Sequence, residues 1–192
     1  MPVIKVQKEE ILRRCWEVLY REGYNGASIS MLAEATGLGK AGLLHHFHSK
    51  ESLMKAVLHY AIGQFRTYVL SVAQEDLPVE QRLEKMLRRQ NRLAKIERNG
   101  CFFANTALEM GRDAQFNSLL SSFFEEWQQV VSGLYATVMP EADARIAAYR
   151  LLLEHEGAIT LYKVTGDTQH LEGMVQRAVA GLAPSLLSAQ PV

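Results

Sequence analysis

The chain has few cysteines, few prolines and no excess of charge of either sign. Of its 192 residues, two are cysteine and five are proline, and 21 Lys and Arg balance 21 Asp and Glu. Cys15 and Cys101 show no paired spacing that suggests a zinc site or a disulfide framework, so a reducing cytoplasm is the expected compartment. Zero net charge excludes a polycation that binds anionic polymers along its whole length. Apolar residues still make up 48% of the chain, which is enough for a buried core.

Long apolar runs are also missing. No stretch approaches the roughly 18 uncharged apolar residues of a membrane-spanning helix, so we expect no membrane association. The first residues, MPVIKVQKEEIL, lack the apolar core of a signal peptide. Alternating strand patterns are absent as well. Apolar residues instead recur every three or four positions, which predicts an all-α protein.

The charge is unevenly placed along the chain. Residues 1–60 carry eight Lys and Arg, six Asp and Glu, and four of the six histidines, so we expect an anionic partner to meet this third. The segment EDLP, ending at Pro78, is the clearest break in the helical pattern. We therefore expect a three-helix domain over residues 1–50, a joining helix over 50–71, and a helical bundle over 72–192.

Two short helices joined by a glycine turn are predicted within the first of these regions. Ser28 or Ser30 is suited to cap the first helix, and Gly37 supplies the positive φ that a tight turn needs. The second helix runs from about Lys40 to His46. This is the plan of a helix-turn-helix, whose second helix fits a DNA major groove about 12 Å wide.

The second of these helices carries candidate base-reading side chains. Its spacing turns Leu43 and also Ala41 inward. Lys40 and His45 face outward, where they can donate to purine acceptors, and Leu44 can meet a thymine methyl group. Polar residues near helix N-termini suit phosphates, because free N–H groups there already favour anions. The predicted DNA-binding set, with Ala41 included, is Ser28, Ser30, Lys40, Ala41, Gly42, Leu44, His45, His46 and Lys50.

The stretch EGYNGASISMLAEATGLGKAGLLHHFHSKESLMKAVL resembles the DNA-binding domain of the tetracycline-repressor (TetR) family of transcriptional regulators. The resemblance covers roughly residues 5–60. Its matching features are Gly23-Tyr24, Ser28-Ile29, Leu32-Ala33, Ala35-Thr36-Gly37-Leu38, Phe47 and Ser49-Lys50-Glu51 with Leu53 following. Family members usually carry Tyr where this chain has Leu44, and often Ser or Thr where it has Gly42. That Tyr commonly touches the DNA backbone, so one hydroxyl contact is lost here.

The resemblance implies an N-terminal three-helix DNA-binding domain followed by a C-terminal helical bundle for ligand binding and dimerisation. It also implies a repressor that a small-molecule or electrophile inducer releases from a palindromic operator on double-stranded DNA. The segment 141–164 is apolar on more than one side, and 167–183 carries a stripe of the coiled-coil kind. Surplus apolar surface marks an interface, so we expect these two helices to form a homodimer. No cofactor is expected.

Cys101 is a candidate inducer-sensing residue. It follows Asn99-Gly100 at the expected start of a helix, where the helix N-terminus lowers the pKa of a thiol. The resemblance includes family members in which such a cysteine senses electrophiles or oxidants, whereas the simpler alternative is a buried small apolar residue. The residues predicted to line a ligand site are Cys101, Asn105, Thr106, Glu109, Trp127, Tyr149 and His155.

Three alternatives compete with these interpretations. His45 and His48, three residues apart, would share a helix face and could hold a metal, but no cysteine or pair of acids joins them at ligand spacing. Glu154, His155 and Glu156 are adjacent, and neighbours on a helix diverge by about 100°, so they cannot converge on one substrate. We therefore predict no metal site, no catalytic residue and no enzymatic activity. A helical small-molecule-binding protein without DNA function stays open, because Gly42 and Leu44 depart from the family pattern.

Overall fold

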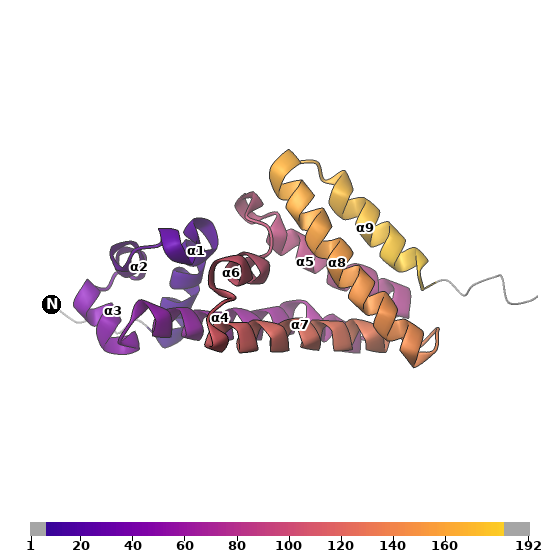
Figure 1. The fold of residues 1–192 in the computed structure, drawn as a ribbon, viewed down its shortest axis with the longest axis horizontal. Helices are drawn as coiled ribbons and strands as arrows, with labels where there is room; N and C mark the ends of the chain where they lie inside the picture. Colours follow the sequence, from indigo (N-terminus) through magenta and orange to yellow (C-terminus); the bar gives the residue numbers. More distant parts are fainter. Residues whose placement is uncertain (1–6, 183–192) are drawn as a thin grey trace, which may run out of the picture. The chain divides into compact units, whose positions relative to one another are not determined.

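The computed structural model describes residues 7–182, and all regular structure in this range is helical, as predicted (Figure 1). Among residues 7–182, each helix is either too short or too polar to span a lipid bilayer. Two short 3₁₀ helices occur at Leu70–Gln74 and Ile96–Arg98. The α-helices are α1 (Lys8–Gly26), α2 (Ile29–Thr36), α3 (Lys40–Phe47), α4 (Lys50–Tyr68), α5 (Val79–Ala94), α6 (Phe102–Met110), α7 (Ala114–Tyr135), α8 (Glu141–Thr165) and α9 (Gln169–Ala180).

Proline and glycine set several of the helix limits. Pro78 and Pro140 directly precede α5 and α8, where a fixed φ suits helix entry and a missing N–H costs nothing. Gly37 and Gly166 end α2 and α8 in the left-handed conformation, with φ of 71° and 76°. These boundaries follow from local signals that are visible in the sequence.

Two predicted helix limits differ from the structure. The joining helix was expected to reach residue 71, but α4 ends at Tyr68 and the chain tightens into the 3₁₀ turn at Leu70–Gln74, which buries Leu70 and Val72. The last helix was expected over 167–183, and α9 is shorter at both ends; Ala183 lies outside the described residues.

The chain forms two compact units, each built from two separate stretches of sequence. The first unit contains the residues up to Arg66 together with Phe102–Leu120. The second contains Thr67–Cys101 and the residues from Ser121 onward. Two of the three boundaries between the units fall inside α4 and α7, and the third directly precedes α6. A division into functional domains at residues 50 and 72 stays a prediction.

In the first unit, α6 completes a core that the three N-terminal helices and α4 begin. Phe102 packs edge-on against Trp16 and Tyr20 of α1, with ring centroids 6.0 and 5.7 Å apart. Phe103 packs edge-on against Phe65 of α4 at 5.6 Å. Such pairs contribute about 0.5–1.5 kcal/mol each beyond the apolar area they bury. Helix α6 is therefore part of the structural support of the N-terminal helices (Figure 1).

In the second unit, α8 and α9 pack side by side (Figure 1). The Tyr135 hydroxyl of α7 donates to the Ala178 carbonyl of α9 at 3.1 Å. Arg177 of α9 pairs with Glu154 of α8 at 2.5 Å. Burial raises the pKa of Tyr135 to about 12, because ionisation would leave a phenolate in the core.

Candidate nucleic-acid interface

Helix α2 begins with a side-chain cap. The Ser28 hydroxyl accepts a hydrogen bond from the backbone N–H of Met31 at 3.2 Å, so Ser28, rather than Ser30, is the capping residue. A cap of this kind stabilises a helix by about 1 kcal/mol. Ser30 lies in the first turn of α2, and both serines are exposed. Both hydroxyls therefore lie at a helix N-terminus that faces solvent.

The turn between α2 and α3 is fixed by its own hydrogen bonds. Gly37 takes a φ of 71°, which only glycine adopts readily. The Leu38 N–H donates to the Ala33 carbonyl at 3.1 Å. The Thr36 hydroxyl donates to the same carbonyl at 2.9 Å and is fully buried. The direction in which α3 leaves the turn is therefore set locally.

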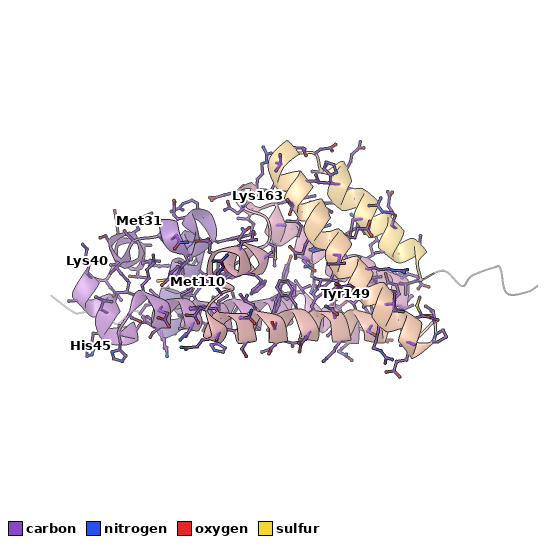
Figure 2. All side chains as sticks on the ribbon, in the orientation of Figure 1. Met31, Lys40, His45, Met110, Tyr149 and Lys163 are labelled. Carbon is purple, nitrogen blue, oxygen red and sulfur yellow. The ribbon has the colours of Figure 1, made fainter. Side chains whose placement is uncertain are left out.

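Helix α3 presents one face to the core and the other to solvent. Leu43 and Phe47 are buried. Figure 2 shows Lys40 at the start of α3 and His45 near its end, both directed away from the ribbon. Eight residues at about 1.5 Å each span about 12 Å, which is close to the width of a major groove. The exposed residues of α3 are Lys40, Ala41, Leu44, His45 and His46.

The expectation that Ala41 faces inward is wrong, because Ala41 is exposed. The buried pair Leu43 and Phe47, four residues apart, defines the inner face of α3, and Ala41 is about 200° around the helix from Leu43. Gly42 is half-buried instead, and a Cβ there would meet the Leu38 Cβ at 3.8 Å, an ordinary contact. The outer face thus includes Ala41.

The chain leaves α3 through an unusual residue. His48 has a φ of +64° and ends the helix. The Ser49 hydroxyl then accepts from the Ser52 N–H at 3.0 Å and caps α4. The Lys50 ammonium lies over the Tyr24 ring, 4.4 Å from its centroid, so a cation–π contact holds this positive charge at the start of α4.

The histidines of this region do not form a recognisable metal centre. The rings of His45 and His46 lie edge-on with centroids 6.0 Å apart, and His48 has already left the helical path. Between residues 7 and 182, no group of three His, Cys, Asp or Glu side chains is placed to hold a metal ion.

Glu109 of α6 binds the backbone just before α2. At Gly23, α1 is interrupted by a non-helical φ of 72° and ψ of 172°. One carboxylate oxygen of Glu109 accepts from the Asn25 N–H at 2.8 Å, and the other accepts from the Tyr24 N–H at 3.3 Å. A Cβ at position 23 would lie 2.4 Å from the carboxylate. Gly23 and Glu109 together fix the segment that leads to the Ser28 cap.

Two of the predicted ligand-lining residues come together in the second unit. The Trp127 indole N–H donates to the Gln90 side-chain oxygen at 2.9 Å, and the Gln90 side-chain nitrogen lies 3.2 Å from Nδ1 of His155. Gln90 was not in the predicted set. Gln90 could have been found as a polar residue at a core position of α5, because it lies three residues after Leu87 and four residues after Met86 on the same helix face.

The other predicted lining residues are divided between the two units. Tyr149 is 52% exposed on α8 (Figure 2). Cys101 is half-buried and directly precedes α6, one residue before the helix begins. In α6, Asn105 is half-buried and the Thr106 hydroxyl donates to the Phe102 carbonyl at 2.8 Å. A role for these residues in ligand binding stays a prediction.

Comparisons with known proteins match both parts of the chain. Residues 11–57 match the model of bacterial regulatory proteins of the tetR family, and residues 79–177 match that of the LmrA/YxaF-like transcriptional regulator C-terminal domain. An uncharacterized HTH-type transcriptional regulator in the lacX 3' region of Lactococcus lactis is 27% identical over 172 residues, covering 86% of this chain and 87% of that protein.

Solved structures agree with these matches. A TetR transcriptional regulator from Legionella pneumophila, 23% identical, superposes with a TM-score of 0.83 over 93% of this chain and 97% of that one. A second, from Chloroflexus aurantiacus, is 26% identical with a TM-score of 0.78 over 93% and 96%. The chain therefore belongs to the TetR family of bacterial transcriptional regulators, and residues 11–57 contain its DNA-binding helix-turn-helix.

Proposed function

We propose that this regulator is a homodimeric repressor that a small-molecule inducer releases from a palindromic operator. The observation that carries the proposal is the exposed outer face of α3, held in direction by the fixed Gly37 turn. On this face Lys40 and His45 are hydrogen-bond donors for purine N7 and O6 atoms, and Leu44 is 36% exposed and suits a thymine methyl group. Ala41 and Gly42 let the backbone approach the groove closely.

The residues that we propose to contact DNA phosphates lie around this outer face of α3. Ser28 and Ser30 lie at the exposed N-terminus of α2, and Lys50 lies at the N-terminus of α4, where backbone N–H groups favour anions. His46 is exposed beside Leu44, which occupies the position of the usual family tyrosine. We assign to His46 the backbone contact that the missing hydroxyl would make.

The dimer of the proposal uses an apolar stripe along α8. Large apolar side chains face solvent at intervals of three, four and eight residues, on the side of α8 that lies away from its buried residues. Half or more of each side chain is accessible in the single chain, which is unusual for residues of this size at a regular spacing. The stripe consists of Ile146, Tyr149, Leu153, Leu161 and Val164.

The stripe is complementary to itself. If two copies of α8 pair antiparallel about a two-fold axis near residue 155, Leu153 falls opposite the partner's Gly157 and Tyr149 falls opposite the partner's Leu161. A Cβ at Gly157 would meet no atom within 4 Å, so the surface there is open to a facing side chain. Helix α9, packed beside α8, completes a four-helix arrangement of two chains. Two recognition helices related by a two-fold axis require a palindromic operator.

The inducer acts by linkage. A ligand that prefers the conformation unable to bind DNA weakens operator binding, and DNA weakens ligand binding by the same factor. A hundredfold release needs about 2.7 kcal/mol of differential affinity. Helices α4 and α7 contribute residues to both compact units, so they are the elements we propose to transmit this difference.

DNA recognition is tested by titrating the protein into labelled DNA from upstream of its own gene and measuring the fluorescence anisotropy of the DNA. We expect Lys40→Ala and His45→Ala each to weaken operator binding at least tenfold, since a lost base contact costs about 1–3 kcal/mol in each half-site. Lys163→Ala, which removes an exposed lysine of α8, is the matched control and should bind normally. Loss of dimer in the α3 variants, or unchanged affinity, would contradict the assigned roles.

Dimerisation is tested by Leu153→Asp. The side chain is 56% exposed in the single chain, so the variant should fold normally. In the proposed dimer the carboxylate would be desolvated without a partner, which costs several kcal/mol, so we expect a monomer at micromolar concentration by light scattering. Glu80→Asp, at an exposed position of α5, serves as control. A fully dimeric Leu153→Asp protein would refute the α8 interface.

A further inference from the structure

A buried chain of polar side chains links α5, α7 and α8 in the second unit. Trp127 donates to Gln90 at 2.9 Å, and Gln90 lies 3.2 Å from His155 Nδ1. Trp127 is 1% exposed, Gln90 7% and His155 0%. Burying an amide and an imidazole in an apolar core is unfavourable unless their polar atoms find partners. The pattern of donors and acceptors in this chain is therefore informative.

The direction of each hydrogen bond in the chain is determined by its first member. An indole nitrogen only donates, so the Gln90 atom facing Trp127 is its oxygen, and its NH₂ group faces His155. Nδ1 of His155 must then accept, because two donors would otherwise meet. The neutral imidazole therefore carries its proton on Nε2. Glu156, whose oxygen is 3.7 Å from Nδ1, is too far for a hydrogen bond.

The proton on Nε2 is a buried donor. No hydrogen-bond partner for Nε2 occurs in the part of the chain that the structure describes. The ring of Trp127 lies nearby, with centroids 6.2 Å apart and planes tilted by 34°. One turn away along α8 in each direction, the neighbours of His155 are the buried apolar residues Leu151 and Ile159. The Nε2 donor is thus buried without an acceptor among the described residues, and apolar and aromatic side chains lie on either side of His155.

We propose that His155 Nε2 is the recognition donor for the inducer, and that the inducer is an uncharged, mostly apolar molecule with an oxygen acceptor such as a ketone or ester carbonyl. This inference rests on the ligand response proposed above. A carboxylate is disfavoured, because the acidic side chain of Glu156 already lies 3.7 Å from Nδ1 of the same ring. An ammonium is disfavoured because it would meet a donor. Trp127 and Gln90 act as positioning residues that hold the His155 tautomer.

The site is tested with matched pairs of small molecules that differ only in the acceptor. Acetophenone with ethylbenzene, and benzophenone with diphenylmethane, are titrated against the full-length protein by calorimetry, with benzoate as the anionic member. We expect one ketone to bind about tenfold more tightly than its hydrocarbon, which is the effect of one satisfied buried donor. His155→Phe should bind both members of the pair equally while keeping its helicity and subunit count.

The tautomer is tested on the wild type, so the proposal does not depend on whether His155→Phe folds. Nitrogen NMR of labelled protein should show His155 protonated at Nε2, with its signal shifted by the ketone and not by the hydrocarbon. Protonation at Nδ1, a permanently bound water on Nε2, or equal affinities within every pair would overturn the proposal.

The same titration separates this site from the repressor function. Operator affinity is measured by anisotropy with and without the same ketone. If the ketone binds with the expected preference and operator affinity does not change, the His155 site is present but the proposed release of DNA by a ligand is refuted. If operator DNA binds as proposed and no ketone is preferred over its hydrocarbon, the repressor proposal stands and the proposed role of His155 is refuted.

Discussion

Replacing Gly23 with alanine tests how the recognition helices are held. Gly23 has a φ of 72° and a ψ of 172°, a combination that is essentially confined to glycine and costs other residues about 1–3 kcal/mol. The added Cβ would also lie 2.4 Å from the Glu109 carboxylate, which must move away from the Tyr24 and Asn25 N–H groups. Two exposed hydrogen bonds of this kind contribute about 1 kcal/mol together. We expect a total loss of about 2–4 kcal/mol.

The measurement is urea unfolding followed by far-UV circular dichroism at one fixed protein concentration, since dimerisation would otherwise shift the midpoint. Gly26→Ala is the matched control. Gly26 lies at the end of α1, and a Cβ there meets only the Glu22 Cβ at 3.7 Å. This variant should stay within about 0.5 kcal/mol of the wild type.

A double-mutant cycle isolates the contribution of Glu109. Glu109→Ala alone should cost about 1 kcal/mol. Combined with Gly23→Ala it should cost less than the sum, by about 1 kcal/mol, because each change removes the same two hydrogen bonds. A Gly23→Ala protein as stable as the wild type would refute the backbone argument. Strict additivity would refute the role given to Glu109.

Two further predictions concern buried titratable groups. The pKa of Tyr135 is raised from about 10 to about 12, so its contribution to the free energy of unfolding is present below pH 10 and is lost as the pH rises toward 12. Tyr135→Phe should therefore flatten the decline of stability at alkaline pH. A decline as steep as in the wild type would count against this. Burial raises the pKa of Cys15 to about 12, so a disulfide reagent should label only Cys101 in the folded protein. Cys101→Ser should abolish both this labelling and any release of DNA by N-ethylmaleimide. Rapid labelling of Cys15 would refute its burial.

The helix-turn-helix could be predicted closely because its signals are local. Gly37 as turn residue and Leu43 as core residue each depend on neighbours within a few positions, whereas the sequence left the cap open between Ser28 and Ser30 and the structure identifies Ser28. Ala41 was misplaced because a helix of eight residues shows barely two turns, too few to define its inner face by pattern alone. The surplus apolar surface of α8 was likewise predictable, since its residues exceed what one face can bury.

The contacts between distant parts of the sequence could not be predicted. The carboxylate of Glu109 meets a backbone 84 residues away at Asn25, and Gln90 meets His155 across 65 residues. Nothing in the local sequence of Glu109 distinguishes it from a solvated acid near a helix end. For the same reason the aromatic contact of Phe102 with Trp16 was not foreseen.

The split construction of the first unit has a consequence for biosynthesis. A nascent chain that has emerged only as far as Arg66 still lacks Phe102 and Phe103, so Trp16, Tyr20 and Phe65 lack their edge-on contacts with these two rings, although Trp16 can already pack against Tyr60. The helix-turn-helix is translated first, but its supporting contacts with α6 form only after Phe103 has been translated. Prematurely terminated products would therefore be poor competitors for the operator.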